Sequence, residues 1–474
     1  MPPVQPFSAW LLRPAWHAGT CIRQAEARRP SHNRVKSHAG AGWRPRPFPV
    51  LAFPIVKAAH SSGPNRWPNV LRALHHRNFR LYFIGHAIST LGTWVQTVAL
   101  SWLVYRLTGS AALLGITTCA TLLPQLLVGP IAGAWIDRHD KRRLLMLIEA
   151  LLAIQALGLA LLTWLELINP TLIVILAATL GVLNAVDTPL RQSLLSRLVD
   201  DRDDLPNALA LNAMLFTCSR FVGPPLAGLL LALTGEALCF ALNSLSYAGL
   251  ILGLLAIRLA PGEKASGSMR NMFREGLDYT LRSPPLRALI LGVLVVNLTA
   301  STYAVLLPVF AHDIFAGDAR TLGWLWGAAG LGSLLSTVLL AGRQSVDRLR
   351  GLILFSAIAS AVGLLLFASS RYLPLSLLAM VILGFGVTIN NVGTNILLQS
   401  QAPEALRGRV VSIYTSTRFG FDAIGGLLAG LLAAHLGGPW AMHIAAALLA
   451  AYCVWQLLLQ RRPAPEPVIE ESAP

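Results

Sequence analysis

Three ionisable side chains interrupt two apolar stretches of the chain. Arg220 lies in the stretch 207–233, and Arg418 and Asp422 lie in the stretch 409–433. In apolar surroundings a carboxylate can take up and release a proton, and a nearby arginine can stabilise its charged form or bind an anion. Arg418 and Asp422 are one helical turn apart, so a helix would place them on one face, where they can pair. A permanent ion pair with a structural role explains the same residues, and both interpretations stay open.

Other polar residues within apolar stretches extend this set of candidates. Asp187 and Arg191 have the spacing of a helical pair around Pro189, near one end of the stretch 168–190, where a gating or packing role is favoured over proton transfer. Amide side chains could line a polar cavity, although joining helices by hydrogen bonds is their commoner role in membranes. The candidate amides are Asn297, Asn390, Asn391, Asn395 and Gln96.

The elements that hold these residues are predicted to be membrane-spanning helices. Of the 474 residues, 54% are hydrophobic and 13% are charged, and the mean hydropathy is +0.59, whereas about 25% of residues are charged in soluble domains. Apolar runs of about 20 residues cross a hydrocarbon core of about 30 Å as helices, which satisfy their own backbone hydrogen bonds. Twelve helices are expected, at 80–104, 111–135, 143–165, 168–190, 207–233, 237–258, 287–310, 320–342, 350–369, 374–398, 409–433 and 437–460.

The distribution of basic residues predicts the orientation of these helices. Of the 38 lysines and arginines, 24 fall in the segments on the side of the two termini, against three, Arg106, Arg320 and Arg371, on the other side. By the positive-inside rule we expect a multi-pass protein of the plasma (inner) membrane with both termini in the cytoplasm. The net charge of +16 therefore leaves no basic groove for nucleic acid.

Composition also predicts how the chain is divided. Residues 1–65 carry nine basic side chains and one acid, which indicates a disordered basic extension, a start codon placed too far upstream or a targeting peptide, but not a secretory signal peptide. Two six-helix bundles are expected at 75–258 and 287–460, joined by a cytoplasmic linker at 259–286. A disordered tail is expected at 461–474.

Several kinds of site have no signature in the sequence. The five cysteines are scattered, and no CxxC or HExxH spacing occurs, so no metal is expected. No G-x-x-x-x-G-K-[ST] occurs, so ATP is not expected as the energy source, and no cofactor is predicted. An enzyme would need His, Cys or carboxylate side chains clustered at one membrane face, and no such cluster is visible. We therefore expect a protein that is not an enzyme.

The two halves of the chain resemble one another. QSLLSRLVDDRDDLPNALALN at 192 is followed by GPPLAGLLLALTG at 223, and QSQAPEALRGRVVS at 399 is followed by GGLLAGLLAAHLGG at 425. When this repeat is aligned at Gly228 and Gly430, Arg220 becomes equivalent to Asp422. Transporters use two parallel repeats of six helices to expose a mid-depth site first to one side and then to the other. A rocking carrier is therefore the hypothesis.

A dense charged segment, GAWIDRHDKRR at 133–143, joins the second and third predicted helices. Gly133 permits close helix packing, and Asp137 at the start of the next helix suits the positive end of the helix dipole. Asp137 could also pair with an arginine of the other half and close a gate, whereas ordinary anchoring at the membrane surface explains the basic residues alone. The predicted gate residues are Gly133, Asp137, Arg138, Arg142, Arg143 and Arg409.

GAWIDRHDKRR resembles the loop signature of the major facilitator superfamily, roughly G-x-x-x-D-R-x-G-x-R-R. It departs where Asp140 replaces the second glycine, which puts the conformation of the turn in doubt. SRFVGPPLAG at 219–228 resembles the antiporter motif g-x-x-x-G-P-x-x-G-G of the same superfamily through Gly223, Pro224 and Gly228. In that family the motif accompanies proton-coupled export. A Gly-Pro pair within a helix also permits a bend and close packing.

Five further stretches narrow the resemblance. NFRLYFIGHAISTLGTW at 78, YRLTGSAALLG at 105, DTPLRQSLL at 187, CFALNSLSY at 239 and RGRVVSIY at 407 together resemble the transmembrane secretion effectors, the branch that includes the enterobactin exporter and macrolide efflux proteins. The similarity covers about residues 75–460. It implies an all-α membrane protein with the major facilitator fold of twelve helices in two parallel repeats.

The leading functional hypothesis is a proton-coupled exporter of a small amphipathic compound, such as a drug or a siderophore-like molecule. The proton gradient would supply the energy, and Asp422 would carry the proton beside Arg418, with Arg220 contacting an anionic substrate or a second carboxylate. The expected partners are the lipid bilayer, the substrate and protons, and the expected state is a monomer. An uptake permease of the same fold is the alternative, followed by a polytopic membrane protein that does not transport.

Overall fold

The computed structural model describes residues 69–136, 139–257, 277–341 and 346–460, and every regular element in these ranges is helical. The predicted all-α fold is therefore confirmed for this part of the chain. The predicted extension (1–65), the predicted tail (461–474) and residues 259–276 of the predicted linker lie outside the described residues. The long helices are α1 (Arg77–Thr108), α2 (Ala111–Ile136), α3 (Lys141–Trp164), α4 (Pro170–Leu195), α5 (Leu205–Ala256), α7 (Pro284–Val309), α8 (Ala319–Ala341), α9 (Val346–Ser369), α10 (Leu373–Gln401), α11 (Arg407–Leu436) and α12 (Gly438–Gln460).

Short helical segments accompany these long helices. They are the 3-10 helices η2 (Asn69–His75), η3 (Arg202–Asp204) and η5 (Glu404–Leu406), and a π-helical turn, η4 (Phe310–Ile314), that continues α7. Within the described residues, eleven helices are long and apolar enough to cross a membrane. Large apolar side chains face outward from them, among them Ile154, Leu233 and Leu245, each more than 60% exposed. An outer surface of this kind suits lipid and not water.

Helix α5 is the exception in length, because it contains 52 residues. At about 1.5 Å per residue a straight helix of this length would be about 78 Å long, far more than the membrane core of about 30 Å. Gly235 breaks it with φ 78° and ψ 176°. Both arms then pack on α1, since Gly223 lies against Trp94 and Gly85 lies against Leu250. The chain therefore turns back at Gly235, as the predicted helices 207–233 and 237–258 require.

The helix ends have local causes in the sequence. Gly109 follows α1 with φ 57° and donates its N–H to the carbonyl oxygen of Tyr105 at 2.7 Å, which suits a residue without a Cβ. Asp140 precedes α3 and accepts a hydrogen bond from the backbone N–H of Arg143 at 2.8 Å, as an N-cap does. These turns identify the two ends of the bundle, the Gly109 end and the Asp140 end.

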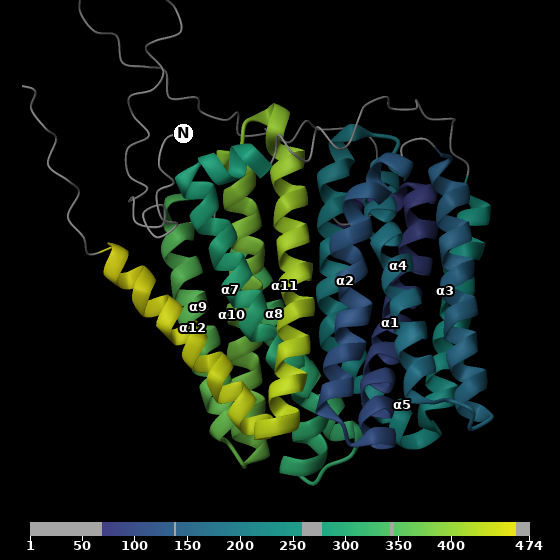
Figure 1. Cartoon of the computed structure of the whole chain (residues 1–474). Coiled ribbons are helices and arrows are strands. Elements are labelled where there is room, and N and C mark those ends of the chain that lie inside the picture. The colour runs from purple at the N-terminus through teal and green to yellow at the C-terminus, as the bar shows by residue number, and fades with distance from the viewer. Residues whose placement is uncertain (1–68, 137–138, 258–276, 342–345, 461–474) are drawn as a thin grey trace, which may run out of the picture. The chain divides into compact units, whose positions relative to one another are not determined.

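Two seams join the helices α1–α5 to the helices α7–α12, and Figure 1 shows the one at which α2 lies beside α11. In one seam α2 packs on α11, and in the other the first arm of α5 packs on α8. Glycines allow backbone to meet backbone at both places, where Gly115 faces Gly430 and Gly228 faces Gly323. If the predicted repeat relates the two halves, these two seams are equivalent to one another. The repeat itself stays a prediction.

The replacement Gly430→Ala should weaken the seam between α2 and α11. The added Cβ would lie 2.5 Å from the carbonyl oxygen of Ala111 and 2.8 Å from the Cα atom of Gly115. Overpacking of this kind destabilises a protein by about 1–3 kcal/mol, and the gain in helix propensity from glycine to alanine is about 1 kcal/mol at most. We expect a lower midpoint of thermal unfolding in detergent.

Gly158→Ala is the matched control for this experiment. Gly158 lies within α3, and apart from its own turn of helix no atom of the described chain comes within 4 Å of the position of its missing Cβ. Its unfolding midpoint should stay the same or rise, because only the helix propensity changes. A Gly430→Ala protein that is as stable as the control would show that the seam is not tightly packed.

Candidate functional site

The predicted mid-helix charges come together between the two halves of the bundle. The guanidinium of Arg220, on α5, donates a hydrogen bond to the hydroxyl of Tyr303, on α7, at 3.0 Å. The carboxylate of Asp422, on α11, interacts electrostatically with Arg220 and with Arg418. Arg220 and Asp422 each lie about 22 Å along their helices from the Asp140 end. These groups therefore face one another at mid-depth, between helices of different halves.

Arg418 and Asp422 interact electrostatically, as their spacing predicts, although no ion pair within 4.0 Å joins them in the described part of the chain. Instead the guanidinium of Arg418 lies 5.1 Å from the ring centre of Phe419 and close to the hydroxyl of Tyr414. Side chains on a helix lean toward its N-terminus, so the long arginine can reach back to Tyr414.

An aromatic cluster adjoins Arg220 through Tyr303, and the sequence analysis did not identify Tyr303 or Trp326. Trp326, on α8, forms T-shaped contacts with Trp94 and with Tyr303, each with ring centres 5.9 Å apart. The indole N–H of Trp326 is buried and has no hydrogen-bond partner among the described residues. Tyr303 and Trp326 are uncharged and lie in apolar stretches, so only the contact of Tyr303 with Arg220 and of Trp326 with Tyr303 identifies them. The site can therefore offer a cation, a carboxylate and aromatic faces to a ligand.

A second charged group lies within the first half, around Arg191 of α4. Its guanidinium donates to Asp187 at 2.6 Å and to Glu149 of α3 at 2.5 Å, and it also contacts the ring nitrogen Nδ1 of His86 on α1. Asp187 and Arg191 were predicted as a helical pair, but Glu149 and His86 were missed. Glu149 was detectable, because it is the one acidic residue in the predicted helix 143–165.

The predicted amides form hydrogen bonds between helices. Gln96, on α1, donates to Gln155 of α3 at 3.2 Å and accepts from Asn243 of α5 at 2.6 Å. Asn297, on α7, and Asn391, on α10, bond to one another reciprocally at 3.0 and 3.3 Å. These buried amides hold neighbouring helices together and are satisfied by one another.

The other two amides of α10 are arranged differently. Asn390 is buried, and its side-chain oxygen has no partner in the described chain. Asn395 is half-buried and accepts a hydrogen bond from Gln399, one turn later on the same helix, at 3.1 Å. Of the four amide residues predicted in the second half, Asn390 is thus the one whose acceptor is open to a ligand or water.

The residues of the predicted gate have separate positions. Asp137 and Arg138 lie outside the described residues, and Gly133 lies in the last turns of α2. Asp137 was expected at the start of the third helix, but Asp140 takes the N-cap position there. An aspartate side chain can accept from the free N–H groups of the first turn, which glycine at that place could not do.

Arg142, in this loop, binds within its own half. Arg142 donates to the carbonyl oxygens of Leu254 and Leu255 at 2.6 and 2.9 Å, so it caps the second arm of α5. Arg143 is exposed in the first turn of α3, and Arg409 is half-buried in the first turn of α11. Arg142 thus makes a structural contact within one half, and the predicted pairing of Asp137 with Arg409 involves a residue outside the described ones and stays a prediction.

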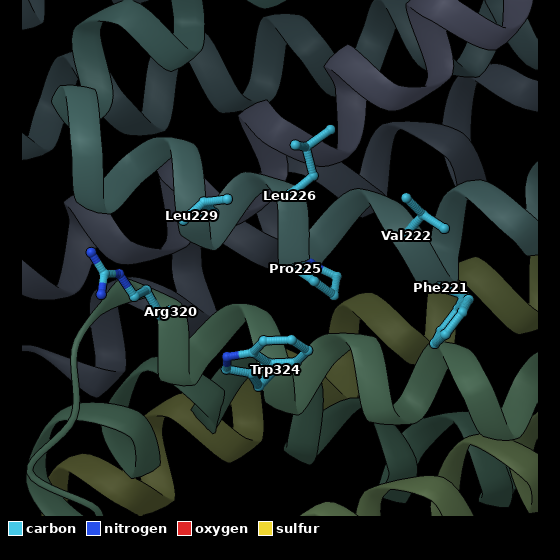
Figure 2. Close-up of a pocket in the computed structure, with 7 residues that line it drawn as sticks. All are labelled: Phe221, Val222, Pro225, Leu226, Leu229, Arg320 and Trp324. Carbon is cyan, nitrogen blue, oxygen red and sulfur yellow. The ribbon is translucent and has the colours of Figure 1, made fainter.

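The predicted antiporter motif lies in the seam between α5 and α8. The carbonyl oxygen of Pro224 would be 2.7 Å from a Cβ on Gly323, and Gly228 faces the same glycine. On the outer side of this seam is a groove of about 390 Å³, lined by Phe221, Val222, Pro225, Leu226, Leu229, Arg320 and Trp324. Figure 2 shows Trp324 below Pro225 and Arg320 at one end of the groove. The groove is almost entirely apolar, so it suits a lipid chain more than a polar ligand.

Residues 69–471 match the family described as transmembrane secretion effectors. The chain belongs to this family of the major facilitator superfamily. Curated relatives to which it is similar include a staphyloferrin A transporter from Staphylococcus aureus, with 26% identity over 76% of this chain and 90% of the relative. The multidrug efflux pump Tap from Mycolicibacterium fortuitum is 28% identical over 73% of this chain and 87% of the pump. The enterobactin exporter EntS from Shigella boydii is 27% identical over 76% and 86% of the two chains.

Solved structures agree with the family at the level of the fold. The nucleoside transporter NupG superposes with a TM-score of 0.65 and 15% identity, covering 81% of this chain and 99% of that chain. A bacterial homologue of the iron transporter ferroportin, solved in an inward-facing state, gives a TM-score of 0.64 with 18% identity and the same coverage. The predicted major facilitator fold is therefore confirmed. The protein is a multi-pass membrane transporter and not an enzyme.

The Gly109 end of the transporter is closed by a contact between its halves. The hydroxyl of Tyr105, at the end of α1, donates to the carboxylate of Asp313, which follows α7, at 2.5 Å. Nearby, Arg106 pairs with Glu236 at 2.6 Å, but both of these residues belong to the first half. The first contact must therefore break when the halves separate at this end, and the second need not.

We expect Asp313→Asn to loosen the Gly109 end, because a neutral amide accepts a weaker hydrogen bond from Tyr105 than a carboxylate does. Hydrogen–deuterium exchange of residues 99–108 and 305–314 should become faster in this variant. Glu236→Gln is the matched control, since it removes a carboxylate from an ion pair within one half. Equal acceleration in both variants would contradict a role for the Tyr105–Asp313 contact in closure.

Proposed function

We propose that the transporter exports small amphipathic compounds, such as drugs or siderophore-like molecules, in exchange for protons. The observation that carries this proposal is the group formed by Arg220, Tyr303 and Asp422 at mid-depth between the halves. Alternating access requires a site that both halves share, and these residues come from both of them. A charged group in a membrane interior that touches the other half is suited to function more than to anchoring.

The proton acts on the attraction between Arg220 and Asp422. When Asp422 is ionised, it attracts the guanidinium from the other half. When Asp422 is protonated, that attraction is lost, and the carboxyl group no longer attracts a donor or cationic group of the substrate. The proton and the substrate therefore compete for the ionised carboxylate, and this competition couples their movements in opposite directions. Trp94, Trp326 and Tyr303 supply the apolar and aromatic surface that an amphipathic compound needs.

The direction of transport is supported by the relatives. Two of those named above are an efflux pump and an exporter, at 28% and 27% identity over most of the chain. The antiporter-like motif at 219–228, which in this superfamily accompanies proton-coupled export, packs in the seam between α5 and α8. With the Asp140 end in the cytoplasm, as the positive-inside rule predicts, closure by Tyr105 and Asp313 corresponds to a state that faces the cytoplasm and receives its cargo there.

Asp422→Asn should uncouple transport from the proton gradient, because the amide can neither bind nor release a proton at this place. The substrate is first found by expressing the protein in an efflux-deficient host and testing its susceptibility to macrolides, siderophores and other lipophilic compounds. In everted vesicles, the wild type should then use an imposed pH gradient to accumulate that compound. In Asp422→Asn this gradient-driven accumulation should fall by about tenfold or more, a loss of at least about 1.4 kcal/mol.

Glu404→Gln serves as the control, since Glu404 is an exposed carboxylate in the short helix η5. Its coupling should match the wild type. Unchanged coupling in Asp422→Asn would remove this residue from the mechanism. Accumulation in the opposite vesicle orientation would show an uptake permease, and the absence of any gradient dependence in the wild type would refute proton coupling itself.

A further inference from the structure

The network around Arg191 holds more negative charge than positive charge. Arg191 contributes one cation, and Glu149 and Asp187 contribute two carboxylates. Glu149 is completely buried, and the side chains of Asp187 and Arg191 are each 11% exposed. An uncompensated charge in so apolar a place is strongly unfavourable, so the network needs one further proton.

The pattern of hydrogen bonds limits where this proton can reside. One oxygen of each carboxylate accepts a hydrogen bond from Arg191. The other oxygens, Glu149 Oε2 and Asp187 Oδ1, are buried without a hydrogen-bond partner in the described chain. The two carboxylates nevertheless lie close enough to interact directly. A proton between two carboxyl groups would supply the missing donor and remove the excess charge at once.

His86 is a poor place for the proton. Its Nδ1 faces the guanidinium of Arg191 and must accept from it, so the ring is neutral and carries its hydrogen on Nε2. A protonated imidazole would place a second cation directly against Arg191. The neutral ring is also stacked on Tyr82, with ring centres 5.2 Å apart.

The ionisable groups of the network and those that face it come from four helices. Tyr82 and His86 come from α1, Glu149 from α3, Asp187 and Arg191 from α4, and Tyr247 from the second arm of α5. Ser89 adds a hydroxyl at 3.5 Å from Arg191. Arg191 is the one cation among these groups, so the second carboxylate lacks a counter-charge.

We propose that Glu149 and Asp187 share a stored proton beside Arg191, and that this network is a proton-binding site of the transporter separate from Asp422. Asp187 is the more exposed carboxylate, with 11% of its side chain accessible against none for Glu149, so protons enter and leave through Asp187. The storage of the proton follows from charge and burial alone. Its use in transport rests on the proposed function.

The second half provides an internal comparison. Helices α7 and α10, the counterparts of α1 and α4 in the predicted repeat, are joined by Asn297 and Asn391. That pair is neutral, and each amide both donates to and accepts from the other, so no group there requires a proton. Storage is therefore expected in the first half and not at the corresponding place in the second.

A series of side-chain contacts connects this network to the group formed by Arg220, Tyr303 and Asp422. The ring of His86 packs edge-on against Phe216 of α5, with ring centres 5.4 Å apart. Phe216 precedes Arg220 by one helical turn, so both side chains lie on the same face of α5. Loss of the stored proton would leave a net negative network that holds Arg191 more tightly, and the resulting shift of His86 would reach Arg220 through Phe216.

The proton can be observed without knowledge of the substrate. Infrared spectra of the full-length protein in lipid nanodiscs, in deuterated buffer at neutral pH, should contain the C=O band of a protonated carboxyl group. Glu149→Gln, which keeps the shape of the side chain, should lose this band, and Asp187→Asn should shift or lose it. Glu404→Gln and Asp422→Asn should keep it, because neither residue belongs to the network.

A band that stays unchanged in both Glu149→Gln and Asp187→Asn would overturn the proposal, and so would the absence of any such band in the wild type. Two network variants are used so that one that fails to fold does not decide the result. Gradient-driven accumulation in everted vesicles tests the second step: loss of coupling in Glu149→Gln supports it. If the band is lost but coupling stays at the wild-type level, the site stores a proton but takes no part in transport. If the wild type itself shows no gradient dependence, the proposed function fails while the stored proton stands.

Discussion

Contact between backbones at paired glycines is the constraint on which the rest of this transporter depends. Gly115 with Gly430 and Gly228 with Gly323 bring α2 to α11 and α5 to α8 without side chains between them. This closeness lets Arg220 reach Tyr303 and interact with Asp422 across the boundary between the halves. A larger side chain at any of these glycines would separate the groups that a shared site needs.

The low polarity of the interior explains why the polar residues occur in groups. Gln96 and Asn297 belong to clusters of neutral amides that satisfy one another, as is expected of groups that only join helices. Arg191 instead holds two carboxylates, each with one unsatisfied oxygen. A buried oxygen without a hydrogen-bond partner destabilises the fold, but a group that takes up and releases a proton needs such an acceptor. The two halves therefore differ in the chemistry of their interiors.

The order of acid and base along a helix decided which predicted pair formed. Asp187 precedes Arg191 by four residues, and the arginine, leaning toward the helix N-terminus, reaches the carboxylate at 2.6 Å. Arg418 precedes Asp422 by the same spacing, but its side chain lies beside Phe419 and Tyr414, and no ion pair within 4.0 Å joins it to Asp422 in the described part of the chain. The two pairs have the same four-residue spacing but differ in whether the acid or the arginine comes first, and the spacing alone does not show the effect of that order.

The sequence by itself determined the membrane-spanning helices, their positions and the family, because apolar length and motif spacing are local properties. It also identified Arg220, Asp422 and Asp187 as charges that need partners, since any ionisable residue in an apolar run does. Only the tertiary structure decided what those partners are. Trp326 joins the central group, and Glu149 joins the network around Arg191, through contacts between helices distant in sequence. Such contacts depend on how helices pack against one another, which residue spacing along one helix does not encode.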